Sequence, residues 1–171
     1  MKKITGELLE LADSVALALV AVMVIFTLFF RIYQVEGQSM EKTLLEGDRL
    51  LVSHLFYTPK DGDIVCFVAH NYHQKVLVKR VIATPGEVID ITSDNKVSVN
   101  GKVLDEPYLA EGIYTTPNGF SFPYTVREGE VFCMGDNRVN STDSRILGPV
   151  ETKYLLGRLI VRVLPNPGVI R

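Results

Sequence analysis

The pattern of apolar and polar residues divides the chain into an apolar run near the N-terminus and a longer region of short alternating runs. Residues 14–30 read SVALALVAVMVIFTLFF and contain no charged side chain. At about 1.5 Å per residue, such a helix approaches the hydrocarbon core of a bilayer, about 30 Å thick. Residues 31–35 extend the apolar path, because an arginine at position 31 can snorkel. The pattern predicts a transmembrane anchor over 14–35, after a short segment, 1–13.

Two other interpretations compete with a permanent anchor. A cleaved signal peptide usually has an apolar region of about 7–15 residues that ends at small residues. This run is longer and ends in Phe-Phe-Arg-Ile-Tyr. A buried core helix would be apolar on every face, which is unusual in so small a domain. The charges do not decide the orientation, since Lys2 and Lys3 precede the run while Arg31, Lys42 and Arg49 follow it.

The region after residue 35 has the pattern of a β domain. Short runs rich in β-branched residues occupy 49–53, 63–69, 75–83, 87–91, 130–134 and 156–164. Asn100 and Gly101 lie between two alternating runs within 97–104, which is the strongest local signal for a hairpin. Residues 93–128 are looser and contain several Gly, Pro and Tyr. The predicted fold class is mainly β, with 36–171 as one domain and 93–128 as a small inserted lobe.

Composition and charge exclude several classes of protein. Hydrophobic residues make up 47% of the 171 positions, which excludes a disordered chain. The formal net charge of −2 excludes a strongly basic protein that binds nucleic acid. Cys66 and Cys133 are too few for a disulfide-rich scaffold or a four-thiolate zinc site, and their apolar contexts favour buried thiols over a disulfide. His70 and His73 lie in a predicted hairpin loop, with no third metal ligand apparent.

Three segments carry the candidate chemistry. Ser39 comes two residues after Gly37, where the backbone can turn tightly, although a linker serine is the simpler interpretation. Lys79 lies inside an apolar run. Burial can lower the pKa of a lysine from about 10.4 by roughly 3–5 units, which would make a general base, whereas simple alternation would point it to solvent. The third segment, 134–148, concentrates Asp, Ser and Arg, as in a hydrogen-bonded loop or a solvated turn.

The spacing and order of these segments carry a resemblance. Gly-x-Ser-Met-x-x-Thr-Leu spans 37–44, Lys-Arg-Val-Ile spans 79–82 with Pro-Gly-Glu following, and Gly-Asp-Asn-Arg…Ser-x-Asp-Ser-Arg spans 135–145. Together with the anchor, they resemble the bacterial type I signal peptidases, membrane-anchored serine proteases with a Ser–Lys dyad. The resemblance implies an antiparallel β catalytic domain in which Ser39 is the nucleophile and Lys79 the general base.

The resemblance also implies roles for the surrounding residues. Ser141 would hydrogen-bond and orient the Lys79 amine, and Asp143 would hold the loop. The Ser39 N–H would be one oxyanion donor. Some relatives carry a hydroxyl at the position of Gly37, so a second donor must come from elsewhere here. Supporting ion pairs are expected from Arg145, Arg80 and Asp136, and the lining of the substrate pockets from Val35, Leu44, Leu77 and Val78.

The activity implied is removal of signal peptides from secretory preproteins after Ala-x-Ala-like sites, through an acyl-enzyme and without a metal or organic cofactor. The implied location is the bacterial cell membrane, with a single pass, the N-terminus in the cytoplasm and the catalytic domain on the outer face. The expected partners are preproteins and the lipid bilayer, near the protein-export channel, and not nucleic acid.

Two positions depart from the family pattern. Lys42 stands where the family usually has Pro, and Ala83 where it usually has Gly. Lys42 is the one feature that favours a rival interpretation, a silent membrane-anchored protein that captures signal peptides without cutting them. Retention of Ser39, Lys79 and the 135–145 motif opposes it. A self-cleaving repressor-type Ser–Lys protease would carry a DNA-binding module in place of the apolar helix.

Overall fold

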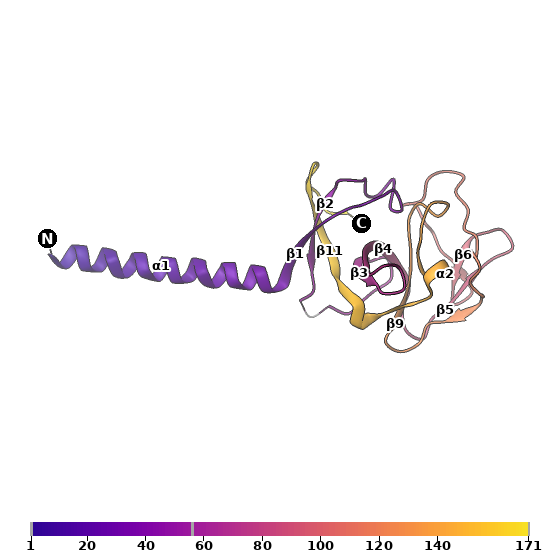
Figure 1. Ribbon diagram of the computed structural model, residues 1–171, viewed down its shortest axis with the longest axis horizontal. Coiled ribbons are helices and arrows are strands. Elements are labelled where there is room, and N and C mark those ends of the chain that lie inside the picture. The colour runs from indigo at the N-terminus through magenta and orange to yellow at the C-terminus, as the bar shows by residue number, and fades with distance from the viewer. Residues whose placement is uncertain (1, 56, 171) are drawn as a thin grey trace.

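The computed structural model describes residues 2–55 and 57–170. Helix α1 (Lys2–Phe29) projects from a β domain that contains the rest of the chain (Figure 1). Its segment Glu10–Phe29 is long and apolar enough to cross a membrane, and none of it is buried against the domain. The predicted apolar helix is confirmed, and its exposure excludes the core-helix interpretation.

The helix ends earlier than the predicted anchor, 14–35. Strand β1 (Phe30–Gln34) follows α1 with no connecting residue and pairs antiparallel with β2 (Arg49–Ser53). This pairing gives the β1 backbone its hydrogen-bond partners outside a helix. The junction is packed, since the Phe26 and Phe30 rings stack with centroids 4.8 Å apart. The last part of the predicted anchor therefore belongs to the β domain.

A seven-stranded antiparallel sheet forms the main body, in the order β1-β2-β11-β3-β4-β9-β10. Its remaining strands are β3 (Ile64–Ala69), β4 (Lys75–Ala83), β9 (Glu130–Met134), β10 (Val150–Glu151) and β11 (Leu155–Leu164). Two short helices, α2 (Ser144–Leu147) and η1 (Thr152–Tyr154), flank β10. The predicted mainly β, antiparallel domain is confirmed. Strands β2, β3, β4, β9 and β11 match predicted runs to within a residue, whereas β1 and β10 were not predicted as strands.

A second sheet of four strands, in the order β7-β6-β5-β8, lies between β4 and β9 in the sequence. Its strands are β5 (Val88–Ile91), β6 (Val97–Val99), β7 (Lys102–Val103) and β8 (Tyr124–Thr125). Asn100 and Gly101 join β6 to β7 with φ values of 53° and 77°, as a type I′ hairpin turn requires. This lobe begins with β5, earlier than the predicted 93–128.

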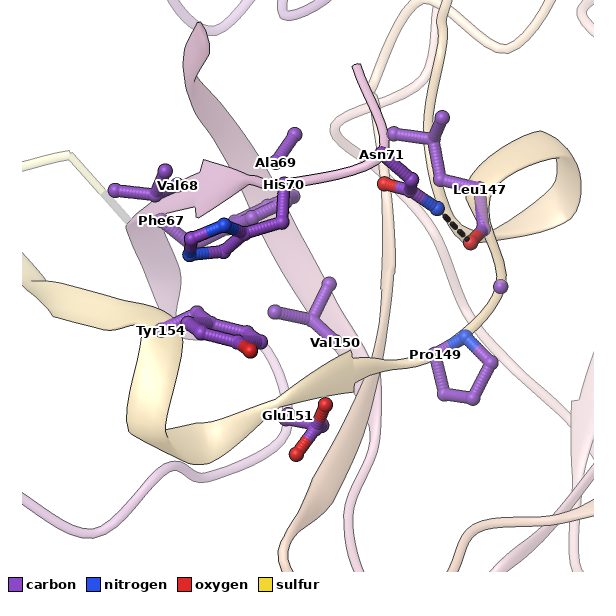
Figure 2. Close-up of a pocket in the computed structure, with 11 residues that line it drawn as sticks. Phe67, Val68, Ala69, His70, Asn71, Leu147, Pro149, Val150, Glu151 and Tyr154 are labelled. Carbon is purple, nitrogen blue, oxygen red and sulfur yellow. Dashed lines mark hydrogen bonds between the residues drawn. The ribbon is translucent and has the colours of Figure 1, made fainter. Parts of the chain in front are cut away.

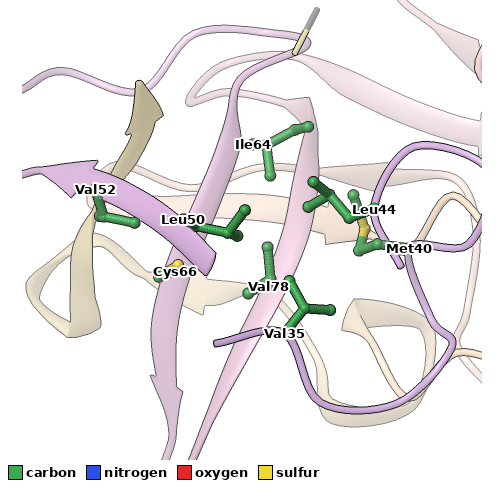
Figure 3. Packing of buried hydrophobic residues seen from close by; sticks show 8 residues of the cluster. All are labelled: Val35, Met40, Leu44, Leu50, Val52, Ile64, Cys66 and Val78. Carbon is green, nitrogen blue, oxygen red and sulfur yellow. The ribbon is translucent and has the colours of Figure 1, made fainter. Parts of the chain in front are cut away.

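The core consists of several clusters of buried side chains. Figure 3 shows the one beneath the 35–48 loop, where Met40 and Leu44 from the loop meet Ile64 and Val78 from the sheet. Cys66 belongs to this cluster and Cys133 to a different one, and both are free thiols. The cysteines therefore act as small apolar core residues, as their strand contexts predict.

Candidate active site

Ser39 and Lys79 meet between the loop after β1 and the middle of the main sheet. The loop is closed at its base, where the Val35 N–H donates to Asp48 O at 2.9 Å and the Gly47 N–H donates to Val35 O at 3.0 Å. Lys79 lies on β4 between β3 and β9. Its Nζ is 2.8 Å from Ser39 Oγ, in a hydrogen bond, and it also donates to Val78 O at 2.9 Å.

Burial changes the acid–base behaviour of Lys79. The side chain is only 2% exposed, because β4 is covered on both faces from Val78 to Ala83. Desolvation lowers the pKa of Lys79 to about 8, against the opposing charges of Asp143 and Asp136. A substantial fraction of the amine is therefore neutral near pH 7–8, which suits a general base. The alternation that would point Lys79 to solvent does not apply to a strand covered on both faces.

Asp143 organises the loop beside the dyad. It is fully buried and forms the N-cap of α2. Its carboxylate accepts from Arg145 Nε at 2.9 Å, from Arg145 Nη2 at 2.8 Å and from the Gly135 N–H at 3.0 Å. Burial by itself raises the pKa of Asp143, but the hydrogen bonds and charge of Arg145 outweigh it and leave the pKa below its usual range. Arg145, expected in a supporting ion pair, thus has Asp143 as its partner.

A second buried pair joins the lysine strand to the serine loop. Arg80 donates from Nε and Nη2 to the two oxygens of Asp136, at 2.9 and 2.7 Å. The Thr43 hydroxyl donates to the same carboxylate. Asp136 thus connects Arg80, the neighbour of Lys79, to the loop that carries Ser39. Arg80 and Asp136 were both expected in supporting ion pairs, without their partners, and the contribution of Thr43 was not expected.

Ser141 lies next to the dyad without the predicted hydrogen bond to Lys79. Its Oγ is buried and makes no hydrogen bond to Lys79 Nζ among the described residues. Gly135 makes room for it, since a Cβ there would lie 2.3 Å from Ser141 Oγ and 2.4 Å from Ser39 O. The close packing places Ser141 against the Ser39 loop, and its hydroxyl interacts with the Asp143 carboxylate, whose pKa it helps to lower.

The dyad opens onto a cleft of about 260 Å³. Leu77 lines this cleft, as predicted. The other three predicted substrate-binding residues, Val35, Leu44 and Val78, lie in the buried cluster of Figure 3 and not in the cleft lining. The sequence analysis missed several lining residues, which carry no motif signal of their own: Glu36, Gln38, Tyr72, Lys75, Val76, Asn140 and Thr142.

Another cavity, of about 240 Å³, lies at the far end of β3 (Figure 2). The His70 and Tyr154 rings lie against each other in its lining, with centroids 4.1 Å apart. Asn71 Nδ2 donates to Leu147 O at 2.7 Å, which ties the β3–β4 hairpin to the end of α2. None of the predicted site residues lines this cavity.

Comparison with known proteins identifies the family of the chain. The family model described as "Signal peptidase, peptidase S26" matches residues 8–164. The chain is 36% identical to the "Probable signal peptidase I-2" of Synechocystis sp., over 94% of this chain and 75% of that one. It is 41% identical to "Signal peptidase I V" of Bacillus subtilis, over 73% and 80%, and 33% identical to "Signal peptidase IB" of Staphylococcus aureus, over 96% and 92%.

Among solved structures, the crystal structure of a signal peptidase I from Enterococcus faecalis V583 superposes with a TM-score of 0.51 at 29% identity. The superposition covers 60% of this chain and 97% of that one. Three findings indicate the same family: the family match over most of the chain, the relatives above 30% identity and the shared fold. The chain therefore belongs to the signal peptidase family, peptidase S26, and is a hydrolase of the signal peptidase I type.

Proposed function

We propose that the chain is a membrane-anchored serine endopeptidase that removes signal peptides from exported preproteins, with Ser39 as the nucleophile and Lys79 as the general base. The observation that carries this proposal is the 2.8 Å contact between Lys79 Nζ and Ser39 Oγ in a buried environment that favours the neutral amine. A nucleophile within hydrogen-bond reach of a base of matched pKa is the arrangement that covalent catalysis requires.

The proposed reaction proceeds in two stages. Neutral Lys79 takes the proton of the Ser39 hydroxyl as Oγ attacks the scissile carbonyl carbon. The Lys79 ammonium then gives that proton to the departing amine, the C–N bond breaks, and an ester to Ser39 remains. In the second stage Lys79 deprotonates a water that attacks the ester, and the proton returns to Ser39 Oγ. The net result is hydrolysis of one peptide bond.

The negative charge on the carbonyl oxygen needs donors. The Ser39 N–H is proposed as one of them, and no described acceptor engages it in the free enzyme. Gly37 has no hydroxyl to add, but the cleft lining contains the amide side chains of Gln38 and Asn140. The modest size of the cleft supports selection of small residues before the cut, as in Ala-x-Ala.

The proposed setting is the bacterial cell membrane. Helix α1 is the single anchor, with the N-terminus in the cytoplasm and the β domain on the outer face, close to the bilayer and to the protein-export channel. The apolar segment Glu10–Phe29 and the position of Ser39 ten residues after its end support this setting. No metal or organic cofactor takes part in the proposed reaction.

The test is cleavage of an exported preprotein by the full chain in detergent or liposomes. We expect one product whose new N-terminus, read by mass spectrometry, follows a small-x-small site. Ser39→Ala should leave no detectable cleavage, whereas Ser93→Ala, at an exposed serine in the lobe, should cleave like the wild type. Binding of preprotein without cleavage, or cleavage that survives Ser39→Ala, would overturn the proposal.

The pH dependence of cleavage is a separate expectation. Lys79 must be neutral to accept the proton, and its pKa in the free enzyme is about 8. The value of kcat/KM should therefore rise about tenfold per pH unit below pH 7 and level off above about pH 8. Initial rates between pH 5.5 and 9.5 would measure this profile. A rate independent of pH over this range, or one that falls as pH rises from 6 to 8, would contradict the assignment of Lys79.

A further inference from the structure

Residues 106–109 of the lobe receive one cationic side chain from each of the three segments that build the active site. Lys42, from the serine loop, donates through Nζ to the carbonyl oxygens of Pro107, at 3.0 Å, and Leu109. The other two cations come from the lysine strand and the Asp143 loop. The contacts to Lys42 join positions more than 60 residues apart, so they connect the lobe directly to the nucleophile loop.

The lysine strand contributes Arg80. Its guanidinium carbon lies 4.0 Å from the centre of the Tyr108 ring, in a cation–π contact, while its nitrogens hold Asp136. Arg80 is thus held between the ring and the carboxylate, and it is 2% exposed. Because Arg80 follows Lys79 on the same strand, fixing the position of Arg80 restrains the backbone that carries the amine.

The Asp143 loop contributes Arg138, which is 1% exposed. Its guanidinium pairs with the Glu106 carboxylate, and its Nε donates to Gly135 O at 3.0 Å. The next residue toward the N-terminus, Asn137, donates its N–H to Ser39 O at 3.0 Å. Glu106 is therefore connected, through the 135–138 backbone, to the main chain of the nucleophile itself.

The backbone at Lys42 supplies an independent observation. Lys42 has a φ of 82° and is the third residue of a turn. The turn is closed by a hydrogen bond from the Thr43 N–H to Met40 O, at 3.1 Å. This position of a type II turn favours Gly or Asn, and a lysine there carries a conformational cost. Such a conformation persists where the surroundings hold it, and the two charge-assisted hydrogen bonds of the ammonium do so here.

We propose that the 106–109 segment positions the catalytic dyad, and that Lys42 is the positioning residue through which it acts on the turn of Ser39. This inference rests on the proposed function of Ser39 and Lys79. Lys42 touches neither dyad residue in the structure, so its effect is on geometry. A misplacement of about 1 Å can reduce a rate on the order of a hundredfold. Lys42 thus has a role of its own in place of the proline usual in the family.

The test compares variants of the full chain in detergent, with a preprotein as substrate. Lys42→Met keeps the length of the side chain and removes the ammonium, and we expect kcat to fall about tenfold or more with KM within twofold of the wild type. Lys42→Arg, which can still donate to both carbonyls, should restore most of kcat. Lys102→Met removes an exposed lysine of the lobe and should change neither value.

Lys42→Pro gives a sharper expectation. Proline holds φ near −65°, which is incompatible with the 82° observed, and it has no side-chain donor. Restoring the residue usual in the family should therefore lower kcat at least as far as Lys42→Met does. A wild-type or higher kcat in Lys42→Met and Lys42→Pro would overturn the inference.

Hydrogen exchange separates this inference from the proposed function. The N–H groups of Thr43 and Leu44 both donate to Met40 O. In a Ser39→Ala background, where no cleavage occurs, their exchange should be at least tenfold faster with Lys42→Met than with Lys42 or Lys42→Arg. Unchanged exchange would contradict the inference even if the wild type cleaves preprotein. Faster exchange in a protein that cleaves nothing would instead support the role of Lys42 and count against the proposed function alone.

Discussion

Replacing Lys79 by methionine is expected to stabilise the β domain while it reduces cleavage at least about a thousandfold. The two effects have the same origin. Burial lowers the pKa of Lys79 to about 8 in the folded protein, from about 10.4 in an unfolded chain. Keeping a protonated amine in this environment costs about 3 kcal/mol of folding free energy below pH 8. Methionine has a similar length and carries no charge, so this cost disappears.

The net gain is smaller than the cost removed. Lys79 gives up its hydrogen bonds to Ser39 and Val78, each of which contributes about 0.5–1.5 kcal/mol. We expect the free energy of unfolding to rise by up to about 2 kcal/mol at pH 7. Between pH 8 and 10.4 the unfolded chain binds more protons than the folded one, so wild-type stability rises with pH and the gap to the variant should close.

Chemical unfolding of the full chain in detergent, followed by near-ultraviolet circular dichroism at pH 7 and pH 10, measures this difference. Lys60→Met, at an exposed lysine, is the matched control and should shift neither stability nor cleavage. A variant less stable than the wild type at pH 7, or a difference in stability that widens toward pH 10, would contradict this expectation. Either result would show that burial of protonated Lys79 does not destabilise the folded protein.

Replacing Asp143 by alanine is expected to have the opposite effect on stability and the same effect on activity. The Asp143 carboxylate and the Arg145 guanidinium are both fully buried, with Nη2 and Oδ2 2.8 Å apart. Removing one partner leaves an uncompensated charge, at a cost of about 3–5 kcal/mol. That is a large part of the roughly 5–15 kcal/mol that stabilises a typical domain. The variant also loses the acceptor for the Gly135 N–H, beside Ser39 and Ser141.

Unfolding in the same detergent gives the stability of this variant, and the preprotein assay gives its activity. Combining Asp143→Ala with Arg145→Met removes the whole pair and should recover part of the lost stability without recovering cleavage. Asp94→Ala, at an exposed aspartate, should be neutral. If Asp143→Ala lowers the free energy of unfolding by less than about 1 kcal/mol, the buried pair contributes no more to stability than an exposed ion pair does.

Most strands were predictable because the residues within each of them favour the β conformation. Runs such as Lys75–Ala83 and Glu130–Met134 are dense in β-branched and aromatic residues and are bounded by turn residues. The end of the helix was not predictable in this way. Phe30–Gln34 continues the apolar run without a Gly or Pro to stop it, and its strand conformation comes from pairing with β2, a partner later in the sequence.

The motifs named Ser39, Lys79 and the charged residues of the Asp143–Arg145 and Arg80–Asp136 pairs as expected site residues, but they did not say which charges pair with which. Residue type also does not say whether an apolar side chain faces a cleft or the core. Val35, Leu44 and Val78 face the core. The contacts of Lys42 with the 106–109 segment depend on how the lobe packs against the serine loop, and only the departure of Lys42 from the family pattern pointed to them.

Under the proposed anchoring, the direct junction of α1 and β1 is expected to limit where the enzyme cuts. A flexible linker would let the β domain sample a range of heights above the bilayer, but Phe29 and Phe30 are consecutive and β1 is an edge strand of the main sheet. With α1 in the membrane as proposed, Ser39 would therefore be held at a nearly constant distance from the membrane surface. The cleavage position along a membrane-bound substrate would then depend on its distance from the bilayer as well as on the residues around the scissile bond. Flexible residues inserted between Phe29 and Phe30 should let the distance of Ser39 from the bilayer vary and so broaden the range of cleavage positions.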